Sequence, residues 1–242
     1  ANALYHKWLE IARKNVKSGS YFEFNHNMKQ IIKEFDTLET IDFGQKPRVG
    51  VVGEILVKYA PTANNDIVAI IENEGGEAVV PDLIGFMNYS LFNQIWKADE
   101  LNMSQKSKRL AKLGIDAINL LEKPMNKALE KSERFEGIES IYDIAKGAAK
   151  VVSIGNHTGE GWFLTGEMIE LLNNGVKNIV CLQPFGCLPN HIVGKGMLKE
   201  LRRQFKGANI SPIDYDPGSS EVNQLNRIRL MMTTAKKMLK AN

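Results

Sequence analysis

A cysteine in a loop rich in glycine and proline is the residue of this chain best suited to chemistry. Cys187 lies in the segment QPFGCLPNHI, which follows the apolar run Ile179–Leu182. This short, β-branched run predicts a buried strand, and Pro189 is a residue favoured in the first turn of a helix. Cys187 is therefore expected where a strand gives way to a helix N-terminus. Backbone amides and the helix dipole there favour anions and lower a thiol's pKa, which makes a better nucleophile or metal ligand.

Of the other residues near Cys187, one is expected in the core and two are candidates for contact with a cofactor. Cys181 lies inside the predicted strand, where a cysteine acts as a small hydrophobic side chain, so we expect it to be buried and inert. Gly186 and His191 are candidates for contact with a cofactor. His191 follows Cys187 by one helical turn, although capping or surface packing would explain this histidine equally well.

Two further segments carry candidate acid–base groups. Glu54 comes directly after the predicted strand Arg48–Val52, a position where a carboxylate has no obvious structural role. His157 lies in the segment GNHTGEG and could transfer protons or bind a metal, or could hydrogen-bond the loop backbone. We therefore predict Glu54 and His157 as catalytic candidates.

The segment GNHTGEG, residues 155–161, could also cradle an anion with its backbone amides at a helix start. Gly155 and Asn156 are its candidates for cofactor contact. The segment matches neither the phosphate-binding P-loop nor the dinucleotide pattern GxGxxG. No GxSxG pattern is present, nothing in the spacing nominates an acid for a Cys187–His157 dyad, and the cysteines and histidines lack paired zinc-ligand spacing.

Alternating strands and helices predict an α/β fold with a doubly wound parallel sheet, of the flavodoxin or Rossmann-like type. We expect an N-terminal helical extension over residues 1–46 and an α/β domain over residues 47–242. A long helical insertion is expected at about 83–131, broken at Pro124, with one face marked by Leu110, Leu113, Ala117 and Leu120. The predicted strands are 48–52, 77–80, 150–154, 179–182 and 210–213.

A parallel sheet brings its strand-to-helix loops to one edge, where ligands bind. The loops after Gly53, after Ile154 and after Pro184 should therefore share one groove with Cys187. Asp214 and Asp216 follow the last predicted strand and are expected to be turn and cap residues.

Composition limits the class of protein. The chain has 242 residues, 43% of them hydrophobic and 24% charged, with a net charge of +3. This charge gives no argument for nucleic acid, and no stretch approaches the roughly 18 apolar residues of a membrane span. The two cysteines do not form a secreted disulfide framework, so a cytoplasmic location is expected. The chain begins Ala-Asn-Ala without a methionine, which we interpret as a segment cut from a longer protein.

Three stretches together resemble a known family. They are VGVVGEILVKYAPTANN with IENEGGEAVVPDL, QPFGCLPNHIVGKG, and ISPIDYDPGSSEVNQLNRIRLM. They are similar to the 2-hydroxyacyl-CoA dehydratase-related proteins, and most closely to the branch fused to or accompanying ATP-dependent CoA-enzyme activases. The resemblance covers about residues 47 to 232, and QPFGCLPNHI is its most specific part.

The resemblance implies an iron–sulfur protein. Members of the family hold a four-iron, four-sulfur cluster with cysteines from more than one flavodoxin-like domain, and an activase supplies an electron at the cost of ATP. Cys187 would be the metal ligand of this half, acting with another domain of the parent chain. The expected chemistry is electron transfer or reduction of an acyl-CoA-like substrate, as in a lyase or reductase of which this chain holds only part.

Two alternatives stay open. The chain could be a non-catalytic docking domain that contacts the activase and only retains the fold. It could also be a cysteine-dependent transferase or hydrolase, which would need an acidic Cys187 thiol and no metal. The family's other cluster cysteines and the activase ATPase domain have no counterpart in this sequence.

Overall fold

A computed structural model describes residues 1–41, 44–216, 218 and 220–241. The chain divides into two compact units, each of which is described separately. An α/β unit consists of Gly44–Asn93 and Ser140–Asn242, and a helical unit consists of Ala1–Phe43 and Gln94–Glu139. The helical unit thus joins the N-terminal segment to the second part of the predicted insertion.

The α/β unit is built on a four-stranded parallel sheet in the order β2-β1-β3-β4. This is the flavodoxin-like order for the first four strands, and it confirms the predicted doubly wound parallel sheet. The chain turns back at β1, so the topological switch point lies between β1 and β3. The strands are β1 (Arg48–Gly53), β2 (Glu77–Val79), β3 (Asn178–Pro184) and β4 (Asn209–Tyr215).

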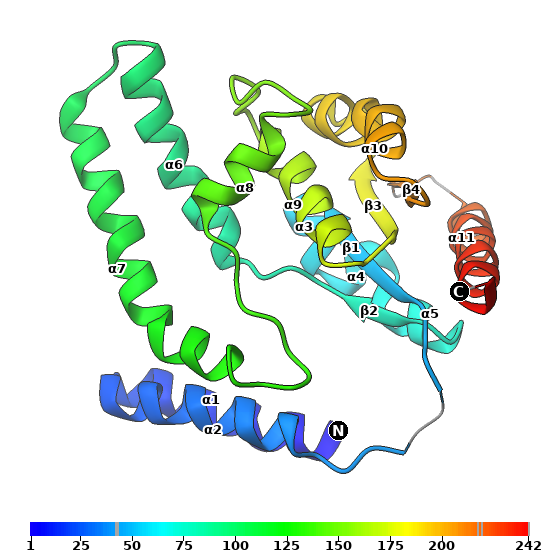
Figure 1. The fold of residues 1–242 in the computed structure, drawn as a ribbon, viewed down its shortest axis with the longest axis horizontal. Helices are drawn as coiled ribbons and strands as arrows, with labels where there is room; N and C mark the ends of the chain where they lie inside the picture. Colours follow the sequence, from blue (N-terminus) through cyan, green and yellow to red (C-terminus); the bar gives the residue numbers. More distant parts are fainter. Residues whose placement is uncertain (42–43, 217, 219, 242) are drawn as a thin grey trace. The chain divides into compact units, whose positions relative to one another are not determined.

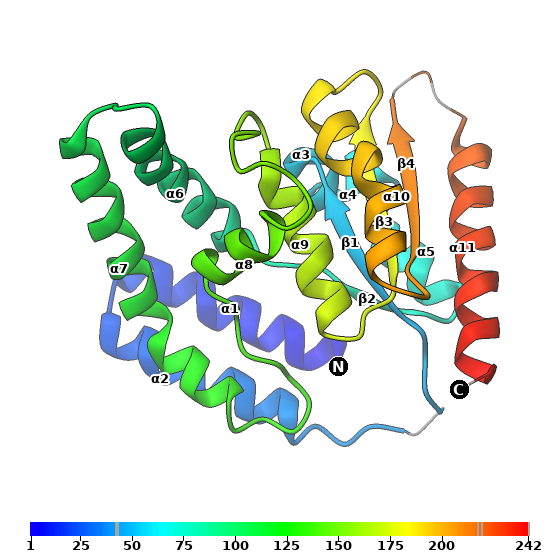
Figure 2. The ribbon, with the colours of Figure 1, turned by 45° about the horizontal axis from the view of Figure 1, so that its top comes forward.

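Helices cover both faces of this sheet (Figure 2). Alternate residues of the strands face α5 (Ile67–Asn73) and α11 (Glu221–Ala241) and form a buried core with them. The opposite face packs against α9 (Gly161–Asn173), where the Cβ of any residue replacing Gly50 would lie 2.6 Å from Leu171. The remaining helices of the unit are α3 (Ile55–Tyr59), α4 (Pro61–Asn64), α8 (Ile141–Ala148), η1 (Asn190–Gly194), η2 (Lys195–Met197) and α10 (Leu198–Gln204).

The outer edge of β4 is closed by side chains instead of by another strand. Its outward carbonyl groups belong to Ile210, Pro212 and Asp214. They accept hydrogen bonds from Arg202, Arg227 and Gln224 respectively. Pro212 also removes one outward N–H, and proline is a residue that natural proteins place on edge strands. The described sheet therefore ends at β4.

The predicted strand Lys150–Ile154 is wrong. After α8 the backbone amides bond back to the helix, with Val151 and Val152 N–H both donating to the Ala148 carbonyl at 2.9 Å. Ser153 then accepts from Asn156 N–H at 3.0 Å and begins a turn. Val152 is buried all the same. A short apolar run is compatible with a strand or with a buried turn, and here the local hydrogen bonds decide.

The helical unit contains α1 (Asn2–Ser18), α2 (Tyr21–Asp36) and α7 (Gln105–Leu129), shown in Figure 1. Glu34 joins α2 to α1 by accepting hydrogen bonds from Lys7 and from the indole of Trp8, at 2.7 and 3.0 Å. Asp36 at the end of α2 accepts from the Ser132 hydroxyl at 2.6 Å, just after α7. The N-terminal extension is therefore helical over α1 and α2, as expected.

The expected break at Pro124 is also wrong, because α7 continues through this residue to Leu129. Helix α7 packs against α2 and buries Ala111 and Ile115, so tertiary packing outweighs the hydrogen bond lost at proline. Helix α6 (Ile84–Glu100) precedes it and runs from the α/β unit into the helical unit. No described helix is both long enough and apolar enough to cross a membrane.

Candidate functional site

The Cys187 loop lies at the carboxyl end of β3, next to the switch point. Cys187 N–H donates to the Pro184 carbonyl at 3.2 Å, and Gly186 between them has φ +75°, which favours glycine. The chain then enters η1, a turn of π-helix, a conformation often found at functional sites. Cys187 is half-buried and has no disulfide partner.

His191 contacts the backbone of Cys187. Its N–H donates to the Cys187 carbonyl at 3.0 Å, and its ring Nδ1 lies 2.9 Å from the same oxygen. The imidazole therefore fixes the loop, and the sequence candidate His191 adjoins Cys187 as its spacing predicts. Next to it, the side chain of Asn190 is fully buried, and neither its oxygen nor its nitrogen has a partner among the described residues.

The segment after β1 lies beside the end of β3. Glu54 N–H donates to the Leu182 carbonyl at 2.9 Å. Gly53 has φ +145°, and a Cβ at this position would lie 2.0 Å from the same oxygen, so only glycine fits. The Glu54 carboxylate accepts from Val57 N–H at 2.8 Å and caps α3. This capping bond is the structural role that the sequence did not reveal for Glu54.

The segment 155–161 reaches the same edge although it follows a turn instead of a strand. The Glu160 carboxylate accepts from Ile55 N–H at 3.2 Å, at the start of α3. A Cβ at Gly159 would lie 3.1 Å from Pro189 of the Cys187 loop. The ends of β1 and β3 and the last residues of this segment therefore meet at one edge of the sheet, whereas the groove that they were expected to share with Cys187 stays a prediction.

The sequence candidates in the first half of this segment have mainly local contacts. The Asn156 side-chain amide donates to the Ser153 carbonyl at 3.1 Å, and the Asn156 backbone carbonyl accepts from Trp162 N–H at 2.6 Å. His157 is half-buried, and its N–H donates to the Gly155 carbonyl at 3.0 Å. These bonds shape the loop that precedes α9.

A buried ion pair connects α3 to α9 beneath this edge. Lys58 Nζ lies 2.6 Å from a Glu167 oxygen, and the two side chains are 3% and 4% exposed. Burial is the largest effect and lowers the pKa of the Lys58 ammonium, but the attraction and hydrogen bonds of Glu167 and Tyr59 together outweigh it, so the pKa is raised. Burial raises the pKa of the Glu167 carboxyl despite Lys58. The ammonium therefore stays charged, and the carboxyl is the member whose charge is more easily lost. No pattern in the sequence predicts that Lys58 and Glu167 form this pair.

Cys181 is fully buried, as predicted, and burial raises the pKa of its thiol to about 12. The nearby negative charges of Glu167 and Asp214 act in the same direction. Its Sγ lies against Gly194 of η1, where an added Cβ would be 3.1 Å away. These surroundings disfavour the thiolate, which is the reactive form.

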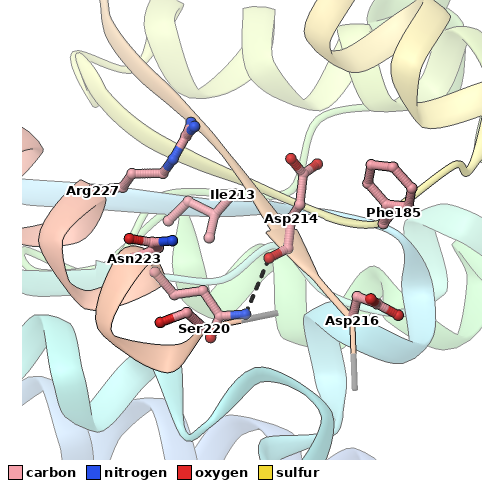
Figure 3. A pocket seen from close by; sticks show the side chains of 8 residues that line it. Phe185, Ile213, Asp214, Asp216, Ser220, Asn223 and Arg227 are labelled. Atoms are coloured by element: carbon pink, nitrogen blue, oxygen red, sulfur yellow. Dashed lines mark hydrogen bonds between the residues drawn. The ribbon is translucent and has the colours of Figure 1, made fainter. Parts of the chain in front are cut away.

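A cavity of about 260 Å³ opens between the end of β4 and the start of α11 (Figure 3). Phe185 of the Cys187 loop lines one side, and Asn223 and Arg227 of α11 line the other. Asp214 lies between them. Its carboxylate accepts from the fully buried Gln183 at 2.6 Å, so it is held in place. The remaining lining residues are Ile213, Asp216, Ser220 and Gln224.

The lining of this cavity contains both carboxylates and a guanidinium. Carboxylates at Asp214 and Asp216 suit hydroxyl groups or a cation, and the Arg227 guanidinium suits an anion. Phe185 is 75% exposed and offers an aromatic face. The sequence predicted Asp214 and Asp216 as turn and cap residues, but Asp214 lies within β4 and pairs with Gln183 of β3. The cavity could not be predicted, because it depends on how β4 and α11 meet.

Exposed apolar side chains flank Cys187 along the chain. Phe185, Leu188 and Ile192 are 75%, 69% and 44% exposed. We call these three residues the Cys187 collar. Large exposed apolar side chains grouped in one segment are typical of a surface that another protein or domain covers.

Within the described ranges no group of three or more histidine, cysteine, aspartate or glutamate residues could hold a metal ion. Comparisons of the chain with protein-family models, with curated proteins and with solved structures gave no match.

Proposed function

We propose that this chain is part of an iron–sulfur protein of the 2-hydroxyacyl-CoA dehydratase and activase system. In this proposal Cys187 supplies one thiolate ligand to a four-iron, four-sulfur cluster. The observation that carries the proposal is the position of Cys187, at the switch point of a parallel sheet and in a segment that also carries the exposed apolar collar. The sequence resemblance around QPFGCLPNHI supports it.

The donor set fits a shared cluster and not a cluster held by these residues alone. A cubane takes about four thiolates, or three with one iron open to substrate. The described residues offer Cys187, while Cys181 is buried in the core. The other ligands would come from another domain or subunit that covers the Cys187 collar. The bound cluster would supply one-electron transfer.

The chain's own residues would position this ligand and a substrate. His191 holds the Cys187 carbonyl and so restricts the loop. The cavity beside Phe185 would take part of an acyl-CoA-like substrate, with Arg227 facing an anionic group and Asp214 accepting from hydroxyls. The collar would exclude water, which strengthens electrostatic interactions at the site.

Metal content of the protein isolated anaerobically with its bound partners tests the proposal. We expect iron, acid-labile sulfide and an electron paramagnetic resonance signal after dithionite reduction. Cys187→Ala should lose most of the iron and the signal, with unchanged circular dichroism because the loop adds little to the core. Cys181→Ala is the matched control and should keep both. Iron and signal at wild-type level in Cys187→Ala would exclude the ligand role.

The exposed collar also favours a second candidate, a docking domain without a cluster that contacts an ATP-dependent activase. In that case the wild-type protein would hold no iron under anaerobic conditions. Leu188→Gln would still weaken association with the activase, because it removes an apolar contact from the interface. Iron content therefore separates the two candidates.

A further inference from the structure

Helix α7 carries an exposed apolar stripe on the helical unit. Leu110, Leu113 and Leu120 are 63%, 67% and 62% exposed, and Ala117 between them is also exposed. Leu121 adjoins them at 46%. We call these five residues the α7 stripe. The sequence marks four of them as one helical face, and the structure leaves that face open.

The α7 stripe is not the face that holds the helical unit together. Ala111 and Ile115 are 3% and 0% exposed, and α7 packs against α2. With 3.6 residues per turn, these positions lie on the opposite side of α7 from Leu113 and Leu120. The helix therefore has two apolar faces, and one of them has its partner within the unit.

The spacing of the stripe is that of a coiled-coil seam. Leu110, Leu113, Ala117 and Leu120 follow one another at intervals of three, four and three residues, as a and d positions do. This repeat matches a second helix, whose side chains insert between those of the first at a small crossing angle. Binding to a flat lipid surface does not require this three-four spacing.

A row of charges beside the seam restricts the partner. Arg109, Asp116 and Lys123 recur at seven-residue intervals, in the g positions that flank Leu113 and Leu120. All three are exposed, and none has a salt bridge to another described residue. The row reads basic, acidic, basic.

This row disfavours a second copy of the chain. In an antiparallel pair of α7 helices the row would face itself, with Arg109 against Lys123 and Asp116 against Asp116. In a parallel pair it would face the e positions, which hold Gly114 and Leu121 and offer no opposite charge. Like charges across an interface suppress the wrong partner.

We propose that the α7 stripe binds a helix of another protein or domain with apolar residues at the same three-four spacing. The partner helix carries an acidic, basic, acidic row at seven-residue intervals beside its seam. The pattern is the same read in either direction, so it suits a parallel or an antiparallel partner. This interface lies on the helical unit and is independent of the proposed cluster.

Two monomeric helical peptides test the proposal with the full chain. Both carry leucines at the three-four spacing, one with a flanking row Glu, Lys, Glu and the other with Lys, Glu, Lys. We expect the chain to bind the first about tenfold more tightly, since each charge pair contributes a few tenths of a kcal/mol to about 1 kcal/mol. The triple variant Arg109→Glu, Asp116→Lys, Lys123→Glu should reverse the preference.

Leu113→Gln should weaken binding of both peptides at least tenfold, while the exposed Leu230→Gln of α11 is the matched control and should change neither. Circular dichroism checks that each variant folds. Equal affinity for the two peptides, or no binding of either at about 1 mM, a concentration that detects even weak binding, would overturn the proposal. Binding of the chain through α7 to anionic phosphatidylserine vesicles, without a preference between the peptides, would also overturn it. So would a dimer in sedimentation experiments that dissociates in the Leu113→Gln variant.

Discussion

Removing one member of the Lys58–Glu167 pair should destabilise the α/β unit strongly and with a defined pH dependence. The two side chains are 3% and 4% exposed, so water solvates neither charged group. Loss of one partner of a buried pair typically costs about 3–5 kcal/mol, because the other charge stays buried without compensation. We expect a cost in this range for Lys58→Met and for Glu167→Gln at pH 7.

The two variants should respond to pH in opposite directions. In Lys58→Met, burial raises the folded-state pKa of Glu167 above its unfolded value of about 4.3, more than in the wild type. A raised pKa gives stability that is complete below the unfolded pKa and is lost as pH rises through the folded one. Lys58→Met should therefore be least destabilised near pH 5 and most at pH 8, by about 1.4 kcal/mol per pH unit within the window.

In Glu167→Gln the unpaired ammonium of Lys58 has a lowered folded-state pKa, so stability is complete above the unfolded pKa of about 10.4 and is lost as pH falls. This variant should therefore recover as pH rises toward 10. The double variant Lys58→Met, Glu167→Leu removes both charges and should be more stable than either single variant and insensitive to pH over this range.

Urea unfolding measures these effects. The buried Trp162 lies on α9, the helix that carries Glu167, and replacing Trp8 and Trp96 by phenylalanine leaves it as the only indole. Lys146→Met, which breaks an exposed pair with Asp143, is the control and should change stability by less than about 1 kcal/mol. The reasoning is refuted if both single variants follow the same pH trend, or if the double variant loses the sum of the two single costs.

Two further predictions concern single side chains. Native protein treated with iodoacetamide should be modified at Cys187, with Cys181 reacting only on unfolding, because burial raises the Cys181 pKa to about 12; mass spectrometry of digests would contradict this if Cys181 reacted first. Tyr215→Phe should raise the free energy of unfolding by about 1–3 kcal/mol at pH 7, because the Tyr215 hydroxyl is buried without a described partner. Burial raises the Tyr215 pKa to about 12. Its stability contribution is complete below the unfolded pKa of about 10 and lost above it, so the variant's advantage in urea titrations should grow from pH 10 to 12.

Periodicity in the sequence was enough to find most of the α/β unit. β1, β2, β3 and β4 overlap the short apolar runs predicted as strands at 48–52, 77–80, 179–182 and 210–213. In each of these elements the apolar pattern can be buried only in the secondary structure that the pattern itself predicts, so local and tertiary preferences agree.

Lys150–Ile154 shows where this reasoning fails. Its apolar residues satisfy burial without joining the sheet, because α8 supplies hydrogen-bond partners for the amides that follow it. The position of Cys187 after β3 could be predicted, since it depends on a strand end and a proline. The Glu54 cap and the Lys58–Glu167 pair could not, because each depends on which segments meet in space.

The Cys187 collar and the α7 stripe have a common physical cause. In both, the residue types are those of a core, yet the fold leaves them exposed: Leu188 at 69% and Leu113 at 67%. Each exposed leucine forgoes about 1.5–3 kcal/mol of burial, and a stripe of several would favour aggregation unless a partner covered it. The two surfaces differ in what limits that partner. In our proposals, a coiled-coil repeat and a charge row limit the partner of the α7 stripe to a helix of defined sequence pattern, whereas ligation by the Cys187 thiol limits the partner of the collar. Variants at one surface should therefore leave binding at the other unchanged.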